Sequence, residues 1–209
     1  EHPERSQWRE LIPQARHVIR GVSVVGDRFL VAYLKDAATH VRVFDLSGRL
    51  EREVTLPAIG EANGFAGRRK DAETFYQFTN FTTPPTVYRY EIRNGQSTVF
   101  RQPKVDFDPQ AYETKQVFYQ SKDGTRVPMF ITHRKGLPLD GNNPTLMYAY
   151  GGFDISITPS FSVMNLVWME QGGVFAVPNL RGGGEYGRAW HEAGMKDKKQ
   201  NVFADFLAA

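Results

Sequence analysis

The run Tyr-Ala-Tyr-Gly-Gly-Phe at residues 148–153 carries the side chains in this chain that are best suited to chemistry. It closes an apolar run typical of a strand, and ligands in open α/β sheets bind beyond the carboxyl ends of strands. There the hydroxyl of Tyr150 could donate to developing negative charge, and the glycines would let the chain turn tightly. The same pattern is also typical of a packed aromatic turn. Spacing alone therefore leaves both interpretations open for Tyr150 and Phe153.

A glycine-rich run at residues 182–187 fits the dinucleotide pattern G-x-G-x-x-G, and Asp205 lies near the spacing of a ribose-binding acid. Two features disfavour a dinucleotide site. Residues 178–181 separate the preceding strand from Gly182, and no periodic helix is expected to begin at Gly187. We therefore predict a tight loop whose backbone lies close to another element.

No serine in the chain has the surroundings of a nucleophile, which in α/β folds lies at a sharp G-x-S-x-G turn between strand and helix. Ser23 has only the first of these glycines, and Ser156, Ser160 and Ser162 have neither. The five histidines lack metal-ligand spacing, and His191, beside a tryptophan, fits a packing role. There is no cysteine. We therefore expect no metal, no cofactor and no cysteine nucleophile.

The composition is that of a folded globular protein. The chain has 209 residues, of which 41% are hydrophobic and 23% charged, and this length can bury a core. The net charge of +3 is scattered along the chain, so nucleic acid is not an expected partner. No apolar run approaches the ~18 residues of a membrane span, so a membrane is not an expected partner either. Cytoplasmic and periplasmic locations both remain open.

Residues 17–107 consist of short runs of alternating apolar and polar residues separated by turn residues, a pattern typical of antiparallel β-structure. Phe29 and Phe75 are 46 positions apart, and so are Phe44 and Tyr90 (44 to 90). A period of ~40–50 residues with four short strands is typical of propeller blades. Two copies cannot close a ring, so the sequence predicts either two blades of a larger propeller or a small sandwich. In the first copy, four apolar-alternating runs predict strands at 22–25, 29–33, 41–44 and 53–56.

From about residue 112 the pattern alternates strands with helices, which is typical of an α/β fold with a largely parallel sheet. Thr158 and Pro159 resemble a helix start, and Gly172 with Gly173 its end. A last helix is predicted from Asn201. Such a sheet needs further elements to cover both faces, so this half is expected to be incomplete. The strands are predicted at 116–119, 127–131, 145–150 and 174–177, and the apolar faces of the two helices at Val163, Leu166 and Val167, and at Val202, Phe203, Phe206 and Leu207.

Residues 112–209 resemble the first part of the catalytic domain of the prolyl oligopeptidases. Residues 17–107 are similar to the last two propeller blades of that family, most clearly at 81–88. The resemblance implies a mixed fold. It places β-propeller blades, the last two of a probable seven, at 1–107, and the N-terminal part of an α/β-hydrolase domain at 108–209. The segments that carry it in the second half are 117–125, 127–131, 148–153, 155–159, 179–187 and the pair Trp190-His191.

The resemblance also implies a function. The family encloses an α/β-hydrolase domain beneath its propeller, admits short peptides and cleaves after proline with a Ser, Asp and His triad. It assigns Tyr150 to the oxyanion hole and Phe153 to the aromatic wall of the proline pocket. The triad would follow the segment where this chain ends, so the isolated chain is expected to be an inactive internal fragment. The implied partners are short proline-containing peptides and the remainder of the same polypeptide.

Two alternative functions differ from this one at definite features of the sequence. The oligopeptidase B group, which cleaves after basic residues, lacks the run Gly151-Gly152-Phe153 and tends to have Ser in place of Gly184. This sequence therefore favours prolyl specificity. A non-enzymatic β-propeller binding module is the other alternative, and it would have no α/β half.

Overall fold

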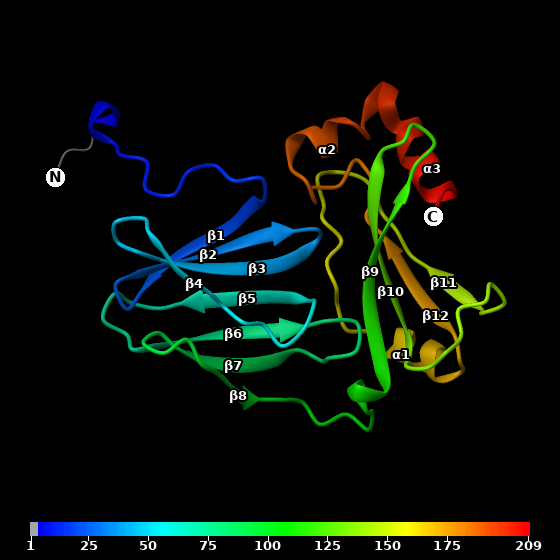
Figure 1. Ribbon diagram of the computed structural model, residues 1–209, viewed down its shortest axis with the longest axis horizontal. Coiled ribbons are helices and arrows are strands. Elements are labelled where there is room, and N and C mark those ends of the chain that lie inside the picture. Colours follow the sequence, from blue (N-terminus) through cyan, green and yellow to red (C-terminus); the bar gives the residue numbers. More distant parts are fainter. Residues whose placement is uncertain (1–3) are drawn as a thin grey trace.

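The two sequence patterns, before residue 107 and after residue 112, correspond to different sheets in the computed structural model. The structure describes residues 4–209 (Figure 1). The first eight strands form two four-stranded antiparallel sheets that lie face to face, ordered β1-β2-β3-β4 and β5-β6-β7-β8. A single 3₁₀ turn, η1 (Arg5–Gln7), precedes them. The strand bounds are Val18–Val25 (β1), Arg28–Lys35 (β2), Ala38–Asp45 (β3), Leu50–Glu53 (β4), Glu61–Ala66 (β5), Glu73–Thr79 (β6), Thr86–Glu91 (β7) and Ser97–Arg101 (β8).

These strands alternate buried and exposed side chains, as the two-residue period of a strand requires. In β6, for example, Thr74, Tyr76 and Phe78 are buried and the residues between them are exposed. The inward side chains of both sheets meet in one apolar core: Val25, Leu30, Val41, Val43, Val54, Ala62, Phe65, Tyr76, Phe78, Tyr90 and Ile92.

The 46-residue spacing marks equivalent strands of the two sheets. Phe29 lies in β2 and Phe75 in β6, while Phe44 and Tyr90 lie in β3 and β7. The predicted fourth strand is wrong by a few residues, because β4 ends at Glu53. Val54 still donates its N–H to the carbonyl of Val41 (2.9 Å), but its side chain turns into the core between the sheets.

The third sheet is mixed, ordered β11-β12-β10-β9. Its strands are β9 (Tyr112–Gln120), β10 (Arg126–Arg134), β11 (Thr145–Met147) and β12 (Val174–Pro178). Among the described strands only β11 and β12 are parallel, so the expected largely parallel sheet is wrong for this part of the domain. The reason is connection length. A turn of five residues joins β9 to β10 and permits only antiparallel pairing, whereas a helical crossover joins β11 to β12.

That crossover helix is α1 (Val163–Glu170), which packs on β10 and β12 through Leu166 and Met169. The predicted start at Thr158 is wrong, because the helix begins only at Val163, after Ser162 in an extended conformation. The predicted end is confirmed, since Gly172 takes a left-handed φ of +86°. The predicted apolar face is wrong in part, since Val163 and Val167 are exposed.

The remaining helical elements follow β12. They are α2 (Arg188–Glu192), the 3₁₀ turn η3 (Lys196–Lys198) and α3 (Lys199–Leu207), while the 3₁₀ turn η2 (Pro109–Ala111) precedes β9. Helix α3 buries Val202 and Asp205, whereas the predicted face members Phe203, Phe206 and Leu207 are exposed. In the part of the chain that the structure describes, no helix is long and apolar enough to cross a membrane.

One connecting segment from each of the first two sheets is buried in the core of the third sheet. Ala37, from the β2–β3 turn, and Phe81, after β6, are buried there with Phe130, Phe175 and α1. The ring of Phe81 lies 5.7 Å from that of Phe130 and 5.6 Å from that of Phe175. The halves are thus joined by packed side chains, which fixes the third sheet beside the first two.

Candidate functional site

The candidate residues lie in the loop that connects the parallel strand β11 to α1. This loop, residues 148–162, is called the candidate loop. The strand ends at Met147, so the predicted strand to residue 150 is too long. Tyr148 still donates its N–H to the carbonyl of Ala176 (3.0 Å), and the chain then departs from the sheet. The loop therefore begins beyond the carboxyl ends of the two parallel strands, the position at which open α/β sheets bind ligands.

Tyr150 and Phe153 lie side by side on this loop and both face solvent. Their ring centroids are 6.4 Å apart with an interplanar angle of 33°. Tyr150 is 42% exposed and Phe153 is 83% exposed. A turn formed only for packing would bury its rings, because burying a large aromatic side chain is strongly favourable. Neither ring is therefore buried in the packed core of residues 4–209, and both are available for contact.

The backbone of this loop is held in an unfavourable conformation. Phe153 and Asp154 have φ of +53° and +59°. The left-handed region costs a residue with a Cβ about 1–2 kcal/mol, so neighbouring groups must hold it there. Asp154 donates its N–H to the carbonyl of Gly182 (3.1 Å), and the Nδ1 atom of His191 lies 3.1 Å from the same nitrogen.

Gly151 is required by both conformation and space. Its φ is +62°, and a Cβ at this position would lie 2.6 Å from Cγ1 of Val202 and 2.9 Å from Cβ of Leu180. Its carbonyl accepts a hydrogen bond from Nζ of Lys199 (2.7 Å). Helix α3 thus supports the backbone of the loop at Gly151.

The glycine-rich segment 179–187 is a tight loop in close contact with the candidate loop, as predicted. A Cβ at Gly184 would lie 2.5 Å from the carbonyl oxygen of Asp154, so a serine there would displace the backbone next to Phe153. The expectation that no helix follows Gly187 is wrong, because the short helix α2 begins at Arg188. His191, for which packing was predicted, is half-buried and makes polar contacts, with its Nδ1 2.8 Å from the carbonyl oxygen of Gly182.

A buried ion pair anchors the glycine-rich segment to α3. Arg181 Nη2 lies 2.6 Å from Oδ1 of Asp205, which is fully buried, and Arg181 Nη1 lies 2.5 Å from Oδ2 of Asp123. The backbone N–H of Arg181 also donates to Asp205 (3.0 Å). The hydrogen bond from Arg181 holds the pKa of the Asp123 carboxyl well below its usual range. Asp205 is therefore inaccessible to a ribose, which excludes the dinucleotide interpretation.

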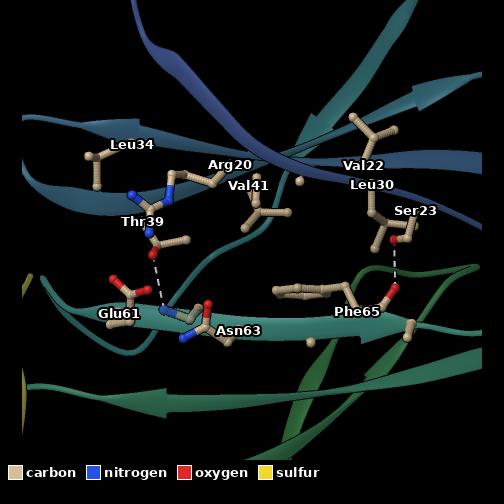
Figure 2. Close-up of a pocket in the computed structure, with 15 residues that line it drawn as sticks. Arg20, Val22, Ser23, Leu30, Leu34, Thr39, Val41, Glu61, Asn63 and Phe65 are labelled. Carbon is tan, nitrogen blue, oxygen red and sulfur yellow. Dashed lines mark hydrogen bonds between the residues drawn. The ribbon is translucent and has the colours of Figure 1, made fainter. Parts of the chain in front are cut away.

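A cavity of about 330 Å³ lies between β1 and β5 (Figure 2). Its polar side chains are Arg20, Ser23, Thr39, Glu61 and Asn63. Ser23 lies in its wall and donates its hydroxyl to the carbonyl of Phe65 (2.6 Å), as Figure 2 shows. A hydroxyl with that partner has no base to activate it, which agrees with the exclusion of Ser23 as a nucleophile.

The other serine contacts are also unlike those of a nucleophile. Ser47 lies in the turn after β3, with its hydroxyl 2.5 Å from Oδ1 of Asp45. Ser121 and Ser156 accept from Arg181 and Arg20. Among residues 4–209 no serine is hydrogen-bonded to a histidine, and no group of three or more His, Cys, Asp or Glu could hold a metal ion.

The residues that support the candidate loop and the adjacent glycine-rich segment could not be identified from the sequence pattern. Arg181, Asp205 and Lys199 make the contacts described above, although they are 27 to 55 positions from residues 150–154. Only Asp205 offered a signal in the sequence, as a charged residue within an otherwise apolar run. Such a signal does not identify the partner.

Comparison with known proteins matches both halves of the chain to one family. A family model described as the N-terminal β-propeller domain of prolyl oligopeptidase matches residues 1–103. A model described as the prolyl oligopeptidase family matches residues 159–209.

Similar sequences and structures cover the whole chain. The prolyl endopeptidases of Elizabethkingia miricola and Dictyostelium discoideum are 49% and 40% identical over 100% and 97% of it. The chain spans only 30% and 27% of those relatives. A solved prolyl endopeptidase has a TM-score of 0.90 at 48% identity, over 99% of this chain and 31% of its own. Galerina marginata prolyl oligopeptidase B, bound to a 35-residue hydrolysis and macrocyclisation substrate, has a TM-score of 0.88 at 33% identity, over 96% and 29%.

Proposed function

Because this chain belongs to the prolyl oligopeptidase family, we propose that it is part of a serine endopeptidase that cleaves short peptides after proline. Its first two sheets belong to the β-propeller domain and its third sheet to the start of the α/β-hydrolase domain. We place the boundary between residues 107 and 108, in the segment that connects β8 to β9. The observation that carries the proposal is the exposed pair Tyr150 and Phe153 beyond the carboxyl end of β11.

In the proposed reaction, the hydroxyl of Tyr150 stabilises negative charge. A serine from the remainder of the polypeptide attacks the carbonyl carbon after proline, and the carbonyl oxygen becomes an oxyanion. Tyr150 donates a hydrogen bond to that oxygen, together with a backbone N–H beside the nucleophile. The support from Gly151 and α3 means that the donor is already in place and need not reorganise during the reaction.

Phe153 is proposed to form one wall of the proline pocket. Its ring is exposed, so a substrate pyrrolidine can cover it. Burial of apolar surface is worth about 25 cal/mol per Å², and a flat ring matches the flat face of proline. The strained backbone at Phe153 and Asp154 directs this ring away from the protein core rather than into it.

Replacing Phe153 by Ala tests the pocket. In the enzyme that contains this chain, KM for a proline substrate should rise by about 10- to 200-fold, because an apolar pocket contact of about 1–3 kcal/mol is lost. Phe100→Ala is a matched control, since Phe100 is also exposed but lies in β8 of the second sheet. Steady-state kinetics of both variants give the comparison. An unchanged KM for Phe153→Ala would remove Phe153 from the site, and cleavage after Arg or Lys but not Pro would favour an oligopeptidase B-like specificity.

The 209-residue polypeptide on its own should neither hydrolyse a proline ester nor react with a fluorophosphonate probe. Such probes label a serine only when a base activates it, and no described serine has a histidine partner. Intact mass after probe treatment measures the labelling, with the longer enzyme as the positive control. Stoichiometric labelling of any serine in residues 4–209 would show that this interpretation is wrong.

A further inference from the structure

Glu185, in the glycine-rich segment, is a buried carboxyl group without a cationic partner. It is 2% exposed, and its Oε1 accepts hydrogen bonds from the N–H of Ile157 (2.9 Å) and from Nδ2 of Asn179 (3.3 Å). Its Oε2 has no hydrogen-bond partner among residues 4–209. Burial raises the pKa of Glu185 above its usual range. Asp205, the other buried carboxylate, differs because Arg181 compensates its charge.

Glu185 and Asn179 hold the same residue of the candidate loop from both sides. Glu185 accepts from the N–H of Ile157, and Nδ2 of Asn179 donates to the carbonyl of Ile157 (2.6 Å). Both backbone polar groups of the half-buried Ile157 are therefore satisfied by side chains rather than by a sheet partner. This also explains why the chain remains extended here instead of beginning α1 at Thr158.

Close backbone packing makes this contact rigid. A Cβ at Gly183 would overlap Oε2 of Glu185 and would lie 2.8 Å from the carbonyl oxygen of Ile155. The bond from Asp154 to Gly182 lies on the same side. Residues 154–157 are thus held at both ends, and Phe153 is the residue immediately before the held segment.

The geometry points to Glu185 and Asn179 as positioning residues that hold residues 154–157, and through them present Phe153 and Tyr150 to the substrate. Neither side chain touches the reacting atoms. This inference rests on the proposed function for the identity of the substrate. The two hydrogen bonds that hold Ile157, called here the Ile157 clamp, are a property of the chain itself. The side chain of Glu185 needs only to accept hydrogen bonds, so a neutral amide can replace it.

The test compares two variants of similar size in the enzyme that contains this chain. Glu185→Gln keeps an oxygen that accepts from Ile157, so its KM and kcat should stay within about twofold of the parent enzyme. Glu185→Leu removes the acceptor and leaves the Ile157 N–H unpaired. A displaced loop should then raise KM for a proline substrate by about 10- to 100-fold. Asn179→Ala should behave like Glu185→Leu, and it supplies the comparison if Glu185→Leu does not fold.

Thr132→Val is the control for a loss of stability alone. Thr132 is fully buried, its hydroxyl lies 3.0 Å from that of Thr114, and it lies in β10 away from the loop. It should lower Tm without raising KM. Equal KM values for Glu185→Leu, Glu185→Gln and Thr132→Val would overturn the inference, as would a Glu185→Gln variant as impaired as Glu185→Leu.

Hydrogen exchange separates a failure of this inference from a failure of the proposed function. Mass spectrometry should show faster exchange across residues 154–157 in Glu185→Leu, and parent-like exchange in Glu185→Gln. This readout needs no substrate. If the parent enzyme does not cleave after proline, the proposed function fails. Hydrogen exchange still shows whether Glu185 holds residues 154–157. If exchange is the same in all variants, the clamp is wrong whatever the activity.

Discussion

Tyr150→Phe should lower kcat on a proline substrate by about 10²–10³-fold in the enzyme that contains this chain, and should change KM little. The hydroxyl is proposed to bind only the developing oxyanion, so its loss raises the transition state by about 2.7–4 kcal/mol without affecting ground-state binding. The ring stays in place, because Gly151 and α3 hold the backbone before Phe153. Its contact with Phe153 therefore remains.

The effect of Tyr150→Phe should also depend on the leaving group. A substrate with a good leaving group needs less stabilisation of the oxyanion, so the loss in kcat should shrink for an activated ester relative to an amide. Tyr148→Phe is the matched control, because Tyr148 is also an exposed tyrosine and lies two positions earlier. Steady-state kinetics on one ester and one amide give all the values. An unchanged kcat for Tyr150→Phe would end the oxyanion assignment.

Asp205→Asn should lower the free energy of unfolding by about 3–5 kcal/mol, because the buried guanidinium of Arg181 loses its buried partner and keeps only the half-exposed carboxylate of Asp123. The carbonyl of Asp205 also accepts from the hydroxyl of Tyr119 (2.8 Å), so the position ties α3 to β9. Chemical denaturation of the enzyme that contains this chain measures the change.

Asp123→Asn is the matched control for the buried pair. Asp123 contacts the same arginine, but its side chain is 47% exposed, and an exposed partner is worth about 0–1 kcal/mol. A double variant, Arg181→Met with Asp205→Leu, should recover much of the stability, since both charges are then removed together. Equal effects of Asp205→Asn and Asp123→Asn would show that the buried pair has no special role.

Local patterns in the sequence were enough to predict most strands and the repeat. Alternation predicts β6 correctly because side chains of a strand point to opposite faces in turn, whatever the strand pairs with. The end of α1 at Gly172 follows from the ability of glycine to take a positive φ. The fit of residues 182–187 to a tight loop follows in the same way. These features depend on the residue and its immediate neighbours.

Tertiary contacts decided what local patterns left open. The late start of α1, for example, accompanies a contact with a distant residue, the hydrogen bond from Asn179 to the carbonyl of Ile157. The direction of strand pairing depended on connection length rather than on side-chain pattern.

The sequence by itself therefore determined the family, the two kinds of sheet and the candidate residues Tyr150 and Phe153. Only the tertiary structure decided that these two rings face solvent and that Glu185 and Asn179 hold the loop behind them. The physical reason is range. Backbone preference and side-chain alternation act over a few residues, whereas exposure, charge compensation and the hydrogen bonds of a loop depend on which distant segments the fold brings together.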